Sequence, residues 1–215
     1  MKVIVFDTET NGLLPRDKNI ISENLHLMPY IVQLSYILFD TTSKKIVIER
    51  DFIIRVPDDV EISKESSNVH GITKEISNLY GISIIDALDD FNISLTKADI
   101  IIAHNISFDT NMIAIESLRN NMDIRRQFTR KINYCTMKRT VQLCKILAVN
   151  KEGKQYFKYP TLTQLHEHLF DETPLGTHNS MADVFICLRC YFKVKFDEDL
   201  CSFSGFKRSF YNICK

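Results

Sequence analysis

Two acidic residues near the N-terminus, Asp7 and Glu9, stand where an apolar run gives way to an Asn-Gly turn. Side chains two residues apart on a strand point to the same side, so both carboxylates would project from one face. Mg²⁺ and Mn²⁺ prefer oxygen ligands of this kind. Acidic residues before a turn are also common as solvated loop ends. The pair therefore indicates a metal site only in combination with residues farther along the chain.

Two more acidic residues and a histidine stand at expected boundaries of secondary structure. Asp109 follows the apolar run 100–102, where it fits either a metal ligand or the N-cap of the next helix. Asp183 comes three residues after Ser180, which fits either a ligand or a capping box with Ser180 as the cap. At about 100° per residue, His178 would point away from Asp183 on one helix. We therefore expect His178 on the loop before that helix.

The elements that must position these side chains follow from the pattern of apolar residues. Runs rich in β-branched residues predict five strands, at 2–9, 31–39, 46–56, 99–104 and 131–136. Helical spacing predicts helices at 84–91, 113–118 and 141–147, one that begins at Thr161 and one that Ser180 caps. Short connections between the first three strands, and helices between the later ones, predict an α/β fold with a mixed sheet whose first three strands are antiparallel.

Composition limits the classes of protein that need to be considered. The chain has 215 residues, of which 45% are hydrophobic and 25% charged, as in an ordinary globular domain. Basic and acidic residues both number 27, so overall charge neither indicates nor excludes a nucleic-acid partner. Only four apolar residues stand between Lys2 and Asp7, and no run is long enough to span a bilayer. We expect an intracellular protein that is not secreted, has no membrane partner and is of undetermined oligomeric state.

Three motifs occur in the order and at the separations of a known family: Asp7-x-Glu9, His104-Asn105-x-x-Phe108-Asp109 and His178-x-x-x-x-Asp183. They resemble those of the DEDDh 3′–5′ exonucleases, which include the proofreading exonucleases of replicative DNA polymerases, oligoribonuclease and RNase T. The segment Val69-His70-Gly71-Ile72-Thr73 is similar to one that many proofreading members carry. The sister group has a tyrosine where this chain has Asn179, so the resemblance implies the histidine version.

The resemblance implies a ribonuclease H-like fold for a domain at 1–195, with 196–215 as an extension of the same domain. It implies hydrolysis of single-stranded nucleic acid from the 3′ end to nucleoside 5′-monophosphates, with two divalent ions, Mg²⁺ or Mn²⁺, as cofactors. The segment 69–73 favours DNA as the substrate, and RNA stays open. Because no polymerase sequence is present, a proofreading role would need a polymerase as a partner.

The same resemblance assigns roles to individual residues. Asp7 would bridge the two ions, Glu9 and Asp183 would complete the site of the attacking water, and Asp109 would hold the second ion. His178 would act as the general base, for which an ordinary pKa of about 6.5 is suited. Substrate contacts are expected from the following residues: Thr8, Thr10, Leu13, His70 and Asn105. Leu13 would wedge between bases, although core packing is the alternative for it.

Other histidines, aromatic residues and cysteines are given structural interpretations. We expect His104 and Phe108 to support the edge from within, and His166 and His168 to be solvated or half-buried without chemistry. Cys187 and Cys190 form a CxxC that fits reduced core thiols or, less well, part of a zinc site.

Some segments and functions remain open. Two interpretations fit the connection 14–30: a loop that covers a functional edge, and a tolerated insertion. Two also fit the aromatic residues after Phe196: docking of a partner, and packing on the core. The basic residues between Arg125 and Arg139 line a backbone groove or are solvated. Two other functions fit the same residues: a non-catalytic module that binds nucleic acid or a polymerase, and a phosphodiesterase of very short oligonucleotides.

Overall fold

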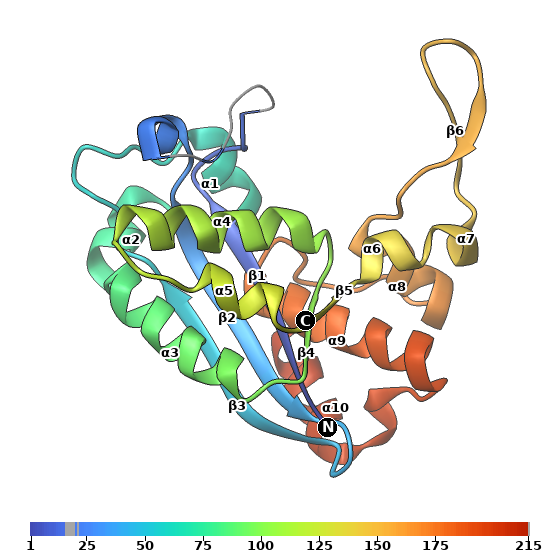
Figure 1. Ribbon diagram of the computed structural model, residues 1–215. Helices are drawn as coiled ribbons and strands as arrows, with labels where there is room; N and C mark the ends of the chain where they lie inside the picture. Colours follow the sequence, from blue (N-terminus) through green and yellow to red (C-terminus); the bar gives the residue numbers. More distant parts are fainter. Residues whose placement is uncertain (16–19, 21, 215) are drawn as a thin grey trace.

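The computed structural model describes residues 1–15, 20 and 22–214, and a central sheet with helices on both sides dominates it (Figure 1). The sheet has the strand order β3-β2-β1-β4-β5. Its strands are β1 (Lys2–Thr10), β2 (Ile31–Asp40), β3 (Lys45–Ile53), β4 (Ile100–Ala103) and β5 (Ile132–Cys135). β1, β2 and β3 pair antiparallel, whereas β4 and β5 join β1 in parallel. The predicted mixed sheet of the ribonuclease H-like fold is confirmed.

Helices and one short hairpin make up the other elements of the described chain. The α-helices are α1 (Lys64–His70), α2 (Lys74–Tyr80), α3 (Ile84–Thr96), α4 (Ile106–Arg119), α5 (Arg125–Thr129), α6 (Thr136–Arg139), α7 (Val141–Cys144), α8 (Leu162–Phe170), α9 (Ser180–Phe196) and α10 (Ser204–Ile213). Two 3₁₀ helices are η1 (Ser22–Leu27) and η2 (Leu200–Ser202), and the hairpin consists of β6 (Leu147–Val149) and β7 (Gln155–Phe157). No helix in the described residues is both long and apolar enough to cross a membrane.

The alternation of side chains along β1 decides which helices each residue meets. Val3 and Val5 pack in a core cluster with α9, whereas Ile4 and Phe6 pack in a second cluster with α3 and α4. β1 lies between two other strands and is covered on both faces, which explains its nearly continuous apolar run. Its odd-numbered residues face α9, so the acidic pair that follows Phe6 is directed to that side of the sheet.

Two capping interpretations are wrong. Asn179, not Ser180, caps α9, because the Asn179 side chain accepts a hydrogen bond from the Ala182 amide at 3.3 Å. Asp109 does not cap α4, since Asn105 occupies the N-cap position and Asp109 lies within the first turn. Asn105 has φ of 68°, a left-handed conformation that asparagine tolerates better than most residues. Asp109 and Asp183 are therefore both free of the capping roles that the sequence allowed for them.

The C-terminal segment, which had no clear pattern, forms η2 and α10 against α9. Phe206 and Phe210 are buried in the same core cluster as α9, so core packing is confirmed for these two rings. Arg189 of α9 is 2% exposed and donates to both carboxylate oxygens of Asp199 at 2.8 Å. Its guanidinium also donates to His166 Nε2 at 3.0 Å. The expectation that His166 is solvated or half-buried is wrong, because this pairing satisfies a buried ring.

The predicted helix at 141–147 is also wrong in its second half. α7 ends at Cys144, and Lys145 takes a left-handed conformation with φ of 48°. Leu147 then begins β6, which pairs antiparallel with β7. In the connection 14–30, residues 16–19 and 21 lie outside the described part, and η1 occupies half of the rest. Tyr30, at its end, donates its amide to Asn11 Oδ1 at 2.7 Å, which fastens the connection beside the Asn-Gly turn.

Candidate active site

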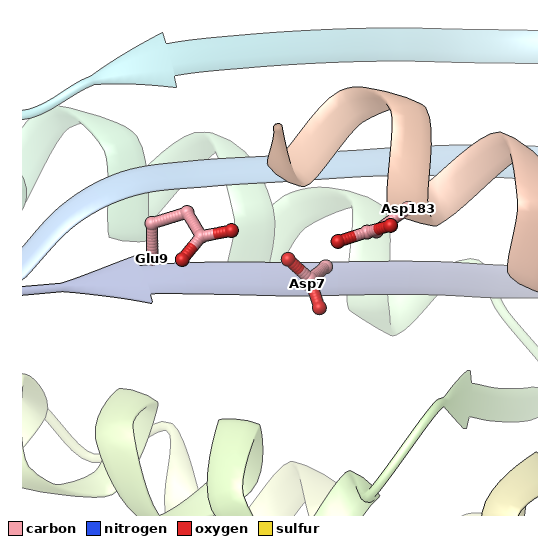
Figure 2. Close-up of side chains that lie close together, drawn as sticks. All are labelled: Asp7, Glu9 and Asp183. Atoms are coloured by element: carbon pink, nitrogen blue, oxygen red, sulfur yellow. The ribbon is translucent and has the colours of Figure 1, made fainter. Parts of the chain in front are cut away.

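Three carboxylates from two distant segments meet at the C-terminal end of β1 (Figure 2). Asp7 and Glu9 project from β1, and Asp183 projects from the first turn of α9. One oxygen atom of each residue can be chosen so that all three lie within 4.8 Å of one another. Within residues 1–15, 20 and 22–214, no other group of three or more His, Cys, Asp or Glu side chains has this geometry. The three oxygen ligands fit a hard divalent cation.

Hydrogen bonds from Ser180 hold the start of α9 against β1. The Ser180 hydroxyl donates to the Asp7 carbonyl at 2.7 Å, and the Ser180 amide donates to Gln33 Oε1 at 3.3 Å. Gln33 lies on β2 and donates in turn to Asp51 at 2.8 Å. Sequence reasoning treated Ser180 only as a cap and did not single out Gln33. A polar glutamine within the apolar run 31–39 was the available signal for the second residue.

Asp109 reaches the site from the other side of the sheet. It is 2% exposed on α4, and its Oδ1 accepts from the Thr8 amide at 3.0 Å and from the Thr8 hydroxyl at 2.9 Å. Thr8 lies between the two acids of β1, so its side chain points to the opposite face from theirs. This placement explains why Asp109 stands outside the three-carboxylate cluster, although its charge raises the pKa of both Asp7 and Glu9.

Burial and mutual repulsion favour the protonated form of these acids. Burial is the largest cause in each case: it raises the pKa of Glu9 to about 8, of Asp109 to about 7 and of Asp183 to about 6. The pKa of Asp7 also lies well above its usual range, because burial and the other three carboxylates both oppose its charge. A divalent cation would compensate these charges, so the donor set fits bound metal.

His178 lies on the loop before α9, as predicted. Its side chain is exposed, and its backbone φ is 70°. The His178 amide donates to Asp183 Oδ2 at 3.2 Å, which ties the loop to the carboxylate cluster. The arrangement places an exposed imidazole close enough to Asp183 to interact with its charge, and Asn179 alone separates His178 from α9.

A pocket of about 270 Å³ opens next to Glu9. Its lining includes Thr8, Thr10, Leu13, His70 and Phe108. Leu13 is 87% exposed, so core packing is excluded for it. Phe108 packs against the core and also lines the pocket, a second role that sequence reasoning did not assign.

His70 is held in the pocket wall by the local turn. Its Nδ1 accepts from the Ile72 amide at 3.1 Å, while Gly71 has φ of 78° and Thr73 caps α2. Nε2 is buried near the Thr10 carbonyl but forms no hydrogen bond of acceptable geometry in the described residues. Because Nδ1 accepts, Nε2 carries the proton and is a donor without an acceptor. Burial lowers the pKa of His70 and keeps this tautomer neutral.

The remaining predicted contacts are placed as follows. Thr8 commits both its amide and its hydroxyl to Asp109, and the Thr10 hydroxyl donates to the Gly12 carbonyl at 2.6 Å. The Asn105 carbonyl accepts from the Phe108 amide at 2.8 Å at the start of α4. Nucleotide binding by Thr8, Thr10 and Asn105 stays a prediction.

His104 supports the edge of the sheet from within, as expected. Its ring donates from Nε2 to the Pro160 carbonyl at 3.1 Å, and Nδ1 pairs with the Thr136 hydroxyl at 2.9 Å. Burial lowers the pKa of His104 to about 4, so this histidine is neutral at ordinary pH. Cys187 and Cys190 are buried free thiols on α9, which fits core packing and not a zinc site.

A mixed sheet with this strand order, carrying carboxylates at the end of its central strand, defines an α/β domain of the ribonuclease H-like class. A family model described as an exonuclease matches residues 4–191, which is most of the chain. The chain belongs to this exonuclease family, and its four acids and histidine follow the DEDDh pattern. Membership of the family implies dependence on a divalent metal ion. A search of curated proteins found no match.

Solved structures of E. coli Exonuclease I share the fold. For the complex with a dA16 oligonucleotide, the TM-score is 0.64 at 17% identity, with 98% of this chain and 43% of that chain covered. For the complex with a dT13 oligonucleotide, the TM-score is 0.63 at 17% identity, with 90% of this chain and 41% of that chain covered. For the complex with a 5cy-dT13 oligonucleotide, the TM-score is 0.67 at 16% identity, with 98% of this chain and 43% of that chain covered. The chain thus spans less than half the length of these neighbours.

Proposed function

We propose that the protein is a 3′-to-5′ exonuclease that hydrolyses single-stranded nucleic acid to nucleoside 5′-monophosphates. The observation that carries the proposal is the meeting of Asp7, Glu9 and Asp183 within 4.8 Å beside a nucleotide-sized pocket. Asp109 completes the set of four acids from the opposite face. A solvated loop end would not collect carboxylates from two distant segments and bury them.

Two divalent ions, Mg²⁺ or Mn²⁺, are the proposed cofactors. Asp7, Glu9 and Asp183 would hold one ion, and Asp7 with Asp109 would hold the other. When bound, such ions lower the pKa of water and stabilise the charge that develops on the phosphate and the leaving 3′ oxygen. Thr8 holds Asp109 in place for this task, because both of its donors bind the Asp109 oxygen Oδ1.

His178 is the proposed general base. Its exposed imidazole can accept a proton from the attacking water, and the hydrogen bond between its amide and Asp183 keeps the loop beside the carboxylates. Proton transfer to a positioned histidine typically contributes a factor of about 10² to 10⁴ in rate. The four acids would hold the metal ions, whereas His178 would carry the proton.

The pocket next to Glu9 is the proposed site of the 3′-terminal nucleotide. The unsatisfied Nε2–H of His70 would donate to a hydroxyl or phosphate oxygen of that nucleotide. The exposed Leu13 side chain would stack against a base without selecting its identity. Thr10 of β1 lines this pocket, and Asn105, the N-cap residue of α4, would contact the same nucleotide.

Single-stranded DNA is the favoured substrate, and RNA remains the alternative. The solved neighbours that share the fold are complexes of E. coli Exonuclease I with dA16 and dT13 oligonucleotides, which supports DNA by analogy. The segment 69–73 points the same way. A polymerase partner and an intracellular location stay predictions.

Matched single strands of DNA and RNA, labelled at the 5′ end and incubated with Mg²⁺ or Mn²⁺, test the proposal. Stepwise shortening of the labelled strand with release of 5′-mononucleotides supports the proposal. The Asp7→Asn variant is the negative control and should release no nucleotides. Cleavage of dinucleotides alone would favour the phosphodiesterase alternative. Binding without any product would favour the non-catalytic module.

A further inference from the structure

The hairpin of β6 and β7 projects from the body of the molecule between α7 and α8 (Figure 1). Its turn is built by specific contacts: Asn150 Oδ1 accepts from the amides of Glu152 at 3.0 Å and Lys154 at 2.9 Å. Gly153 follows with φ of 79°, the left-handed residue that a three-residue hairpin loop requires. The projection is therefore a shaped arm with a defined tip.

Both faces of this arm carry exposed apolar or aromatic side chains. Leu147 and Val149 are 64% and 62% exposed on one face, and Tyr156 is 49% exposed on the other. Phe157 pairs with Leu147 across the two strands and is also exposed. An isolated two-stranded hairpin is at best marginally stable in water, so these side chains are expected to gain from a ligand that covers them.

The charge of the arm indicates the kind of ligand. Four of the fourteen residues 145–158 are lysines, and Glu152 is the acidic residue among them. The whole chain has a formal net charge of +0, so the arm concentrates positive charge that the rest of the molecule balances. Lysines close to two aromatic rings suit a single nucleic-acid strand, whose phosphates bind lysine and whose bases stack on rings.

The base of the arm lies at the edge of the sheet that carries the acids. Pro160, just beyond β7, accepts a hydrogen bond from His104 at the end of β4, and β4 runs parallel to β1. The parallel register aligns Val5 with Ile102, so the ends of both strands meet at one edge. Lys138, just before α7, donates to Ser107 at 3.1 Å in the first turn of α4. Lys138 thus lies beside α4, the helix that carries Asp109, on the stretch of chain that leads into the arm.

We propose that this arm, residues 145–158, binds the single-stranded substrate on the 5′ side of the nucleotides held in the active site. Tyr156 and Phe157 stack on bases, and Lys151 and Lys154 contact phosphates near the tip. The proposal rests on the proposed function for the identity of the strand. It predicts that long strands bind more tightly than short ones and that the arm supplies the difference.

Equilibrium binding in EDTA tests the arm without hydrolysis. The probes are 5′-fluorescein oligo(dT) strands of about 20 and about 4 nucleotides, followed by anisotropy. For Tyr156→Ala/Phe157→Ala we expect roughly tenfold weaker binding of the long strand and unchanged binding of the short one. For Lys151→Gln/Lys154→Gln we expect the slope of log K against log salt to fall in magnitude by about 1.4, because single strands contribute about 0.7 per phosphate contact.

Lys45→Gln/Lys97→Gln is the matched control, since it removes the same charge from exposed lysines at the opposite edge of the sheet. This control should bind both strands as the wild type does. The lysine variants keep the hairpin side chains that pair, so a folding defect cannot imitate their effect. Wild-type binding of the long strand by both arm variants would overturn the proposal.

Two further results separate this inference from the proposed function. Wild-type protein that digests strands, with arm variants that bind and digest identically, would refute the arm and leave the exonuclease proposal intact. Arm variants that lose binding in a protein that digests nothing would support the arm and refute the exonuclease. A change from dimer to monomer in the arm variants, with strand binding unaltered, would overturn the proposal in favour of self-association.

Discussion

At the scale of the residue, the acids of the active site oppose one another in the metal-free protein. Glu9 and Asp183 both have raised pKa values because burial removes water from them, and Asp7 suffers repulsion from three neighbours. In the unfolded chain the same groups ionise at about pH 4. The metal-free native state therefore binds protons more readily than the unfolded state between about pH 4 and pH 8.

The free energy of unfolding of the metal-free protein should consequently fall as pH rises through that window. Asp7→Asn removes one charge from the centre of the cluster, so we expect this variant to melt at a higher temperature than wild type in EDTA at pH 8. At pH 5, where the wild-type acids are largely protonated, the difference should shrink. Thermal unfolding at both pH values measures this effect, and an equal or lower melting temperature for Asp7→Asn at pH 8 would contradict it.

Removal of the proposed general base should separate chemistry from metal binding. We expect His178→Ala to lower kcat by about 10² to 10⁴, because the attacking water loses its proton acceptor. Binding of Mn²⁺, followed by calorimetry, should stay close to that of wild type. His168→Ala, which removes an exposed histidine on α8, is the control and should leave both unchanged. Equal loss of metal affinity in His178→Ala would indicate a ligand instead of a base.

The pairing of Thr8 with Asp109 gives another test at this scale. Thr8→Val keeps the shape of the side chain but removes the hydroxyl that donates to Asp109 Oδ1. Partners of metal ligands typically contribute about 10- to 100-fold to affinity or activity, so a loss of that size in turnover is expected. Thr110→Val, whose hydroxyl bonds only to carbonyls of its own helix, is the control. Normal turnover in Thr8→Val would show that the Thr8 amide alone holds Asp109.

At the scale of the element, α9 has two tasks at its two ends. Its first turn presents Asp183 to β1, and its middle carries the buried Arg189, which pairs with partly exposed carboxylates. The guanidinium lies 3.9 Å from the Phe170 ring centroid and 5.1 Å from that of Phe210. Through Asp199 and Phe210, Arg189 fastens the C-terminal segment to α9.

Removal of this arginine should be costly for the fold. Arg189→Met leaves His166 without its donor and Asp199, whose side chain is 35% exposed, without its cationic partner, and the loss of such hydrogen bonds typically costs about 1–3 kcal/mol. Arg126→Met, which removes an exposed arginine paired with Asp123, should cost about 0–1 kcal/mol. Denaturant unfolding of the two variants compares them. Similar stabilities would show that the Arg189 network contributes little.

The sequence predicted elements where local pattern and burial agree. Most strands of the sheet are rich in β-branched and apolar residues, and all five lie within a few residues of their predicted ranges. The hairpin was missed because the spacing of Val141, Cys144 and Leu147 also fits a helix. Periodicity alone cannot show that Leu147 is exposed and does not pack in the core. The turn signal Asn150-x-x-Gly153 and the pair Tyr156-Phe157 would have favoured a hairpin.

Only the part of the site that depends on local spacing could be predicted from the residues themselves. Spacing along one strand places Asp7 and Glu9 on one face, whereas the division of the acids between two faces depends on which helix covers each face. The bonds from Thr8 to Asp109 and from Ser180 to Asp7 join residues 101 and 173 positions apart. Contacts of that separation arise from the packed fold, so only the family resemblance indicated that these segments meet.

At the scale of the whole molecule, a neutral chain separates its charges. Acidic side chains gather at the end of β1, and lysines gather on the arm between α7 and α8. Such a distribution lets a polyanionic strand approach a site lined with carboxylates, because cations compensate the acids and the lysines attract the phosphates. The sheet holds the two regions at one edge.

The most direct test of the account is the number of Mn²⁺ ions that the protein binds. Titration calorimetry in the presence of a non-hydrolysable phosphorothioate single strand should give two ions per chain for the wild type. Asp7→Asn should lose this binding, since Asp7 is the proposed ligand shared by both ions. Wild-type protein that binds no Mn²⁺ at millimolar concentration, or an Asp7→Asn variant that binds like wild type, would contradict the account.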